Sequence, residues 1–175
     1  GAESQSHKSI AIGNLSGRVF QGERRISMGD EAGRNNQGSE SIAIGQKAGY
    51  KSQSQKSIAI GKLAGKVSTG NYNVIMGGGA AQINTTGDSS VIIGRQAAGG
   101  AVGTAGNNVF IGAGAGYGAT SAAKSVIIGN NAGYALGTHQ SSTIIGFEAG
   151  RFMDAGSGGS VALGYQALYS GTQNY

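Results

Sequence analysis

One motif recurs along almost the whole chain, and its spacing constrains the fold more than any other feature of the sequence. The string SIAIG occurs at Ser9–Gly13, Ser41–Gly45 and Ser57–Gly61, and related strings bring the number of copies to ten. The glycine that ends each copy is position zero, and these glycines are Gly13, Gly29, Gly45, Gly61, Gly77, Gly94, Gly112, Gly129, Gly146 and Gly164. Their sequence numbers differ by 16, 16, 16, 16, 17, 18, 17, 17 and 18. A near-constant period of this length predicts a stack of similar units joined by loops that accept insertions.

The residues before each of these glycines alternate as they do in a β-strand. Positions −1 and −3 are apolar in every copy, with Thr143 as the one exception. Side chains at alternate positions share one face of a strand, so we expect these two columns to lie together on a buried face. Position +3 is Ala or Ser in all ten copies, which indicates that each repeat needs one small side chain. The rest of each repeat is mostly polar, which is typical of a solvated turn.

The pattern predicts an all-β protein: a parallel β-solenoid of about ten turns, each of roughly 16–18 residues. No window shows a sustained helical period. Glycine supplies 35 of the 175 residues, but proline is absent and glycine does not recur at every third position, which excludes a collagen helix. We expect residues 1–8 to be an N-terminal leader segment and residues 9–175 to form a single solenoid domain.

The column at position −2 predicts that the chain associates with copies of itself. It lies on the opposite face of the strand from −1 and −3, and it should be polar if that face met water. The column is apolar instead, and a thin coil has only one interior. Burying its five largest side chains would contribute about 7–15 kcal/mol as an upper estimate. The sequence therefore predicts an interface between two, three or more chains, formed by Ile75, Ile92, Phe110, Ile127 and Ile144.

The strings SIAIG, VIIG and VALG, followed by GxxAG, resemble the head repeats of trimeric autotransporter adhesins. The last repeat, VALGYQALYSGTQNY at Val161–Tyr175, is more similar to repeats of phage tail fibres and related bacterial fibre proteins. The resemblance covers about residues 9–170. It implies a left-handed coil, a homotrimer and an extracellular fibre on a virion or a bacterial surface. The length of each turn favours the tail-fibre type over the adhesin head, whose repeat is shorter.

The partners that this resemblance implies are a bacterial surface glycan, lipopolysaccharide or an outer-membrane protein. The net charge is +5, and residues 1–70 carry ten basic and five acidic groups. Stacked basic side chains, Arg25 among them, would suit an anionic polysaccharide, or would only keep the rod soluble. Tyrosines at position +5 would stack on sugars, or would cover the seams between loops. The predicted surface-binding residues are Tyr117, Tyr134, Arg18, Arg34, Lys51 and Lys66.

Two other classes of partner are not predicted. Phe20 is the only aromatic residue among the basic residues of the first 49 positions. Proteins that bind single-stranded nucleic acids use several aromatic side chains on which bases stack, so we expect no nucleic acid partner. No uninterrupted apolar run approaches the roughly 18 residues of a membrane span, so we expect no membrane insertion.

The sequence also predicts no enzyme, no cofactor and no metal site. The loop GAGAGYGA at Gly112–Ala119 has the glycine spacing of a dinucleotide site, but no helix follows it to hold the phosphates. There is no cysteine, and aspartate is too rare for a calcium-binding β-roll. The units IGxxA, as at Ile44–Ala48, resemble hexapeptides of left-handed β-helix acyltransferases, which need three per turn. That enzyme is the remote alternative, and its candidate bases would be His7 and His139.

Overall fold

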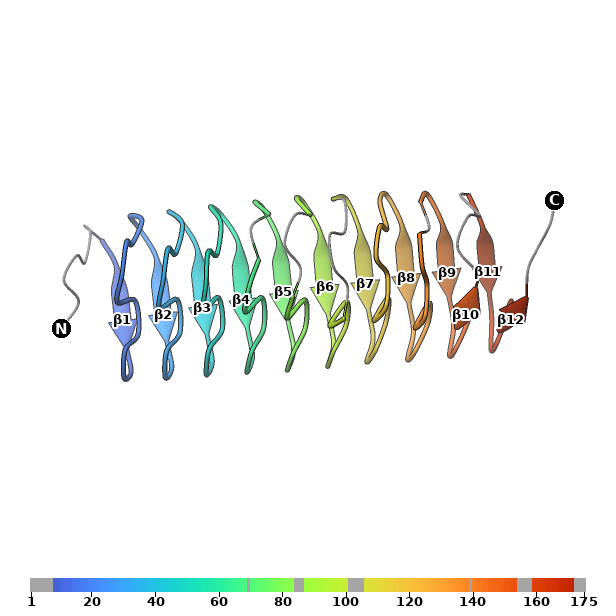
Figure 1. Cartoon of the computed structure of the whole chain (residues 1–175), viewed down its shortest axis with the longest axis horizontal. Coiled ribbons are helices and arrows are strands. Elements are labelled where there is room, and N and C mark those ends of the chain that lie inside the picture. Colours follow the sequence, from blue (N-terminus) through green and yellow to red (C-terminus); the bar gives the residue numbers. More distant parts are fainter. Residues whose placement is uncertain are drawn as a thin grey trace.

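The structure, a computed structural model, describes residues 8–68, 70–83, 87–100, 106–138, 140–153 and 159–171. Its described part contains no helix, and the strands follow one another along a single long axis (Figure 1). The strands are β1 (Ile10–Ile12), β2 (Ile26–Met28), β3 (Ile42–Ile44), β4 (Ile58–Ile60), β5 (Val74–Met76), β6 (Val91–Ile93), β7 (Val109–Ile111), β8 (Val126–Ile128), β9 (Thr143–Ile145), β10 (Phe152–Met153), β11 (Val161–Leu163) and β12 (Ser170–Gly171).

Strands β1 to β9 and β11 form one parallel sheet in chain order, which confirms the predicted all-β solenoid. Each strand pairs with the equivalent residues of the next repeat, so that Ile10 lies opposite Ile26 and Val109 opposite Val126. The sequence period therefore sets the register, because one repeat returns the chain to the same place one strand further along. A second parallel ladder follows position +6: it consists of isolated bridges from Val19 to Val67 and of β10 paired with β12.

The glycine at position zero turns the chain at the end of each strand of the large sheet. Gly129 has a φ of +136°, which L side chains rarely adopt. A β-carbon there would overlap the carbonyl oxygen of Gly146 in the next repeat. The Gly129 amide donates a hydrogen bond to the carbonyl of Ile111, 2.8 Å away. This column thus needs glycine both for its conformation and for the close approach of neighbouring turns.

The interior of the coil is formed by the −2 column, and this reverses part of the sequence prediction. Ile75, Ile92, Phe110, Ile127 and Ile144 are almost completely buried within the single chain. They share one core with the buried alanines at position +3, so the prediction that they form contacts between chains is wrong. The physical reason is width: each strand of the sheet can point only one side chain, that at position −2, into the narrow interior, and the opposite wall fills the remaining space. The face with two large side chains per turn, at −1 and −3, lies outside.

The two ends of the core are filled in different ways. Around β5 to β9 large apolar side chains fill most of the interior, and Leu136 and Met153 from the opposite wall add to it. Around β2 and β3 the side chains at position −2 are small, and buried glutamines occupy the space. The Gln53 side-chain amide donates to the carbonyls of Ile42 at 2.8 Å and Ser57 at 3.0 Å. In this part of the chain, small side chains at position −2 are therefore matched by long polar side chains from across the coil.

The buried alanine column gives the first testable prediction. Ala132 has no exposed surface, so Ala132→Leu would force a larger side chain into a tightly packed interior. We expect the free energy of unfolding to fall by about 1–3 kcal/mol, measured by urea denaturation. Ala135→Leu is the matched control, because Ala135 is exposed in the same turn. Equal denaturation midpoints for the two variants would contradict the inward position of Ala132.

Candidate functional site

A continuous apolar surface of the described chain lies on the outer side of the ten-stranded sheet, which we call the outer sheet face. In-register pairing places its side chains in two straight rows along the rod. Most are half-buried, and exposure is greatest on the two end strands, with Ile12 at 56% and Leu163 at 61%. The rows contain no charged residue, and at about 4.8 Å per strand they run for roughly 45 Å. The row at position −3 consists of Ile10, Ile26, Ile42, Ile58, Val74, Val91, Val109, Val126, Thr143 and Val161. The row at position −1 consists of Ile12, Met28, Ile44, Ile60, Met76, Ile93, Ile111, Ile128, Ile145 and Leu163.

The two predicted surface tyrosines lie next to each other on the side of the rod. The rings of Tyr117 and Tyr134 stack with centroids 4.9 Å apart and planes 8° from parallel. The Arg151 guanidinium lies 5.7 Å from the centroid of Tyr134. Both tyrosines are half-buried. This arrangement favours the seam-covering interpretation over sugar stacking, because the faces of Tyr134 are occupied by neighbours within the chain.

The predicted basic residues do not act as one uniform positive stripe. Arg34 donates to Glu31 at 2.7 Å and to the Tyr50 hydroxyl at 2.9 Å. The hydrogen bond to Glu31 is the main cause that raises the pKa of Arg34. Lys47 also pairs with Glu31, at 3.6 Å. One carboxylate thus compensates two of the cations in this region.

The other three predicted basic residues remain available at the surface. Arg18 and Lys51 are exposed and Lys66 is half-buried, and none has an acidic partner among the described residues. Arg18, Arg34 and Lys66 share position +5, whereas Lys51 belongs to the neighbouring column at +6. The structure therefore brings Arg18, Arg34 and Lys66 into one column and places Lys51 beside it.

Arg25 behaves differently from the other basic residues of this half. It is almost completely buried, and one guanidinium nitrogen, Nη1, donates to Ser27 Oγ at 3.1 Å. Burial lowers the pKa of Arg25 because desolvation disfavours the charged form. Its place at position −4, where other repeats have Ser or Asn, is the sequence signal that separates it from the surface set.

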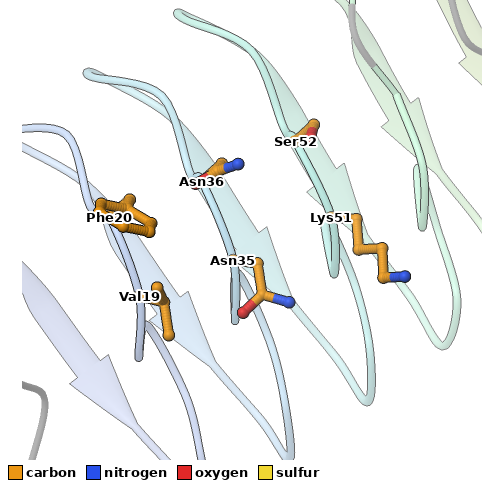
Figure 2. Close-up of a pocket in the computed structure, with 6 residues that line it drawn as sticks. All are labelled: Val19, Phe20, Asn35, Asn36, Lys51 and Ser52. Carbon is orange, nitrogen blue, oxygen red and sulfur yellow. The ribbon is translucent and has the colours of Figure 1, made fainter.

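Sequence reasoning missed a shallow groove of about 290 Å³ on the side of the rod near β2 and β3. Val19, Asn35 and Lys51 line it at position +6, and Phe20, Asn36 and Ser52 at position +7 (Figure 2). Phe20 is 75% exposed, although large aromatic side chains are usually mostly buried. The signal in the sequence was an isolated aromatic residue within a polar connecting segment.

No family model, curated protein or solved structure matches the chain. Among the described residues no group of three or more His, Asp or Glu side chains is placed to hold a metal ion. A helix long and apolar enough to span a membrane is likewise not found in the part of the chain that the structure describes. His7 and His139, the candidate bases of the acyltransferase alternative, lie outside the described residues.

Proposed function

We propose that this chain is a rigid segment of an extracellular homotrimeric fibre, most similar to a phage or phage-derived tail fibre, which attaches to a bacterial surface. The observation that carries the proposal is the outer sheet face. Contiguous apolar patches that meet water usually mark interaction sites, and this one continues without a charge along the whole ten-stranded sheet. The described coil cannot bury this face itself, because its interior is already filled by the −2 column.

A second copy of the same chain is the partner that fits this face best. The face is straight and as long as the rod, so another rod of the same length and repeat covers all of it. In a closed homotrimer three such faces would meet around a common axis, which is symmetric and leaves no face exposed. Threefold symmetry and the left hand of the coil are supported by the resemblance of SIAIG and GxxAG to trimeric fibre repeats.

The head of a bacterial trimeric autotransporter adhesin is the second candidate, and the same outer sheet face supports it. The two candidates differ in what the gene encodes downstream: a self-cleaving chaperone domain belongs to a tail fibre, and a stalk with a membrane anchor to an adhesin. Sequencing the 3′ end of the natural gene therefore separates them. An acyltransferase-like enzyme is the third and weakest candidate.

Light scattering on the purified chain tests the self-association. We expect a particle of about three times 17.3 kDa at micromolar concentration. Ile111→Asp places a carboxylate at the centre of the outer sheet face, and we expect it to yield folded monomers, because burying several unpaired charges at one interface costs several kcal/mol. Lys124→Asp, at an exposed position, is the control and should remain assembled. A wild-type monomer at this concentration would refute the proposal.

A further inference from the structure

The groove around Phe20 differs from every other exposed aromatic site that the structure describes. The ring of Phe147 stacks on Tyr165, that of Phe152 contacts Tyr169 edge-on, and Lys56 lies over the ring of Tyr72. Phe20 has no aromatic or cationic partner among the described residues. Its ring is therefore free to stack on a ligand.

The backbone holds the groove in a fixed shape. Parallel bridges join Val19 to Asn35 and Asn35 to Lys51, so these positions repeat at the spacing of the coil, about 4.8 Å. Phe20, Asn36 and Ser52 each follow one of them directly, and their φ angles are 47°, 53° and 56°. The two rows in Figure 2 are thus set by the ladder and by one repeated backbone conformation. A ligand would meet a preformed surface, which lowers the entropic cost of binding.

The chemistry of the lining residues selects a ligand with three features. The ring of Phe20 offers a flat apolar face. The side-chain amides of Asn35 and Asn36 form no hydrogen bond within the described chain, so their donors and acceptors are available for hydroxyl groups. Lys51 contributes a positive charge, and no acidic residue lines the groove. A pyranose with a carboxylate or phosphate group has all three: an apolar C–H face, a hydroxylated edge and a negative charge.

We propose that this groove is a subsite for an acidic pyranose of a bacterial surface polysaccharide. The sugar ring stacks on Phe20, its hydroxyls bond to Asn35 and Asn36, and its anionic group lies near Lys51. This inference rests on the proposed attachment function and names the class of receptor. A single-stranded nucleic acid is disfavoured, because it would need a series of stacking rings and the groove has one.

Fluorine NMR can locate the binding, because the chain has only four phenylalanines. Phe110 is buried, whereas Phe147 follows β9 closely and Phe152 begins β10. These two strands lie near the other end of the rod from β1 (Figure 1). With 4-fluorophenylalanine at all four positions, a glucuronate-containing hexasaccharide and mannose 6-phosphate should each shift the Phe20 resonance alone. The probe that shifts this resonance at the lower concentration identifies whether the anionic group of the ligand is a carboxylate or a phosphate. Shifts only at Phe147 or Phe152, no shift at all, or an equal response to a short oligothymidylate would overturn the proposal.

Variants of the intact chain then test each contact. We expect Phe20→Leu to weaken binding of the acidic hexasaccharide by about tenfold, and Phe147→Leu to leave it unchanged. Lys51→Ala should weaken the binding of the acidic probes several-fold and leave the binding of neutral maltohexaose unchanged. Added salt should weaken the binding of the acidic probes alone. Light scattering on Phe20→Leu should still give the wild-type mass. Binding that survives in Phe20→Leu refutes the subsite, whereas a monomeric wild type that still binds sugar refutes only the fibre.

Discussion

Gly129→Val is expected to lower the free energy of unfolding by about 3 kcal/mol or more, which is a fall in melting temperature of roughly 6–12 °C for a chain of this size. Two causes act together. Gly129 has a φ of +136°, which a β-branched residue adopts only with strain. Its added side chain would also overlap the Gly146 carbonyl oxygen, so two neighbouring turns would have to separate. Thermal denaturation followed by circular dichroism measures the effect.

Two further variants separate these causes. Gly164 has a similar φ of +117°, but a β-carbon there would have no described atom within 4 Å. Gly164→Val therefore carries the conformational strain without the overlap, and we expect a smaller fall than for Gly129→Val. Asn130→Val changes an exposed residue beside Gly129 and should alter stability little. Equal melting temperatures for Gly129→Val and Asn130→Val would contradict the assigned repeat frame.

Phe110→Asp is expected to unfold the chain under conditions in which the wild type is stable. Phe110 has no exposed surface, and a β-carbon at Gly116 would lie 3.0 Å from its ring, so the site is tightly packed. Removing such a ring costs about 3–5 kcal/mol, and an unpaired buried carboxylate adds to this. We expect loss of the β-sheet circular dichroism signal and rapid proteolysis.

The neighbouring residue gives the control for this variant. Ile111 points to the opposite side of β7, onto the outer sheet face. Ile111→Asp should therefore keep the β-sheet signal while losing assembly, although it introduces the same carboxylate at the next position of the same strand. If Phe110→Asp remained folded as a monomer, the inward orientation of the −2 column would be wrong.

Much of the fold could be predicted from the sequence because the repeat places the same residue types at the same positions. Alternation around Val109–Ile111 and its equivalents indicated strands, and the period indicated parallel, in-register pairing. The direction in which each face points could not be predicted, because both faces are apolar. Only the width of the closed coil decides that the strand face with one side chain, such as Phe110, points inside, and the face with two points outside.

The candidate sites were harder to predict, since they depend on contacts between columns. The occupied faces of Tyr134 result from Arg151 one turn away, and the partial neutralisation of Arg34 results from Glu31 in the same turn. Buried Arg25 and Gln53 looked like ordinary surface residues in a polar segment. Phe20 drew attention only as a single aromatic residue, and its open ring became evident when the neighbouring side chains were placed.

The in-register ladder also bears on how the chain folds. Partners across it are always close in sequence, because Ile10 pairs with Ile26 and Val91 with Val109, each only one repeat further along. Divided by the chain length, such separations give a relative contact order of about 0.1, the range of helical bundles rather than of β-sandwiches. A parallel sheet, usually slow to assemble because distant segments must meet, can here grow from any two formed turns by adding the next segment of the chain.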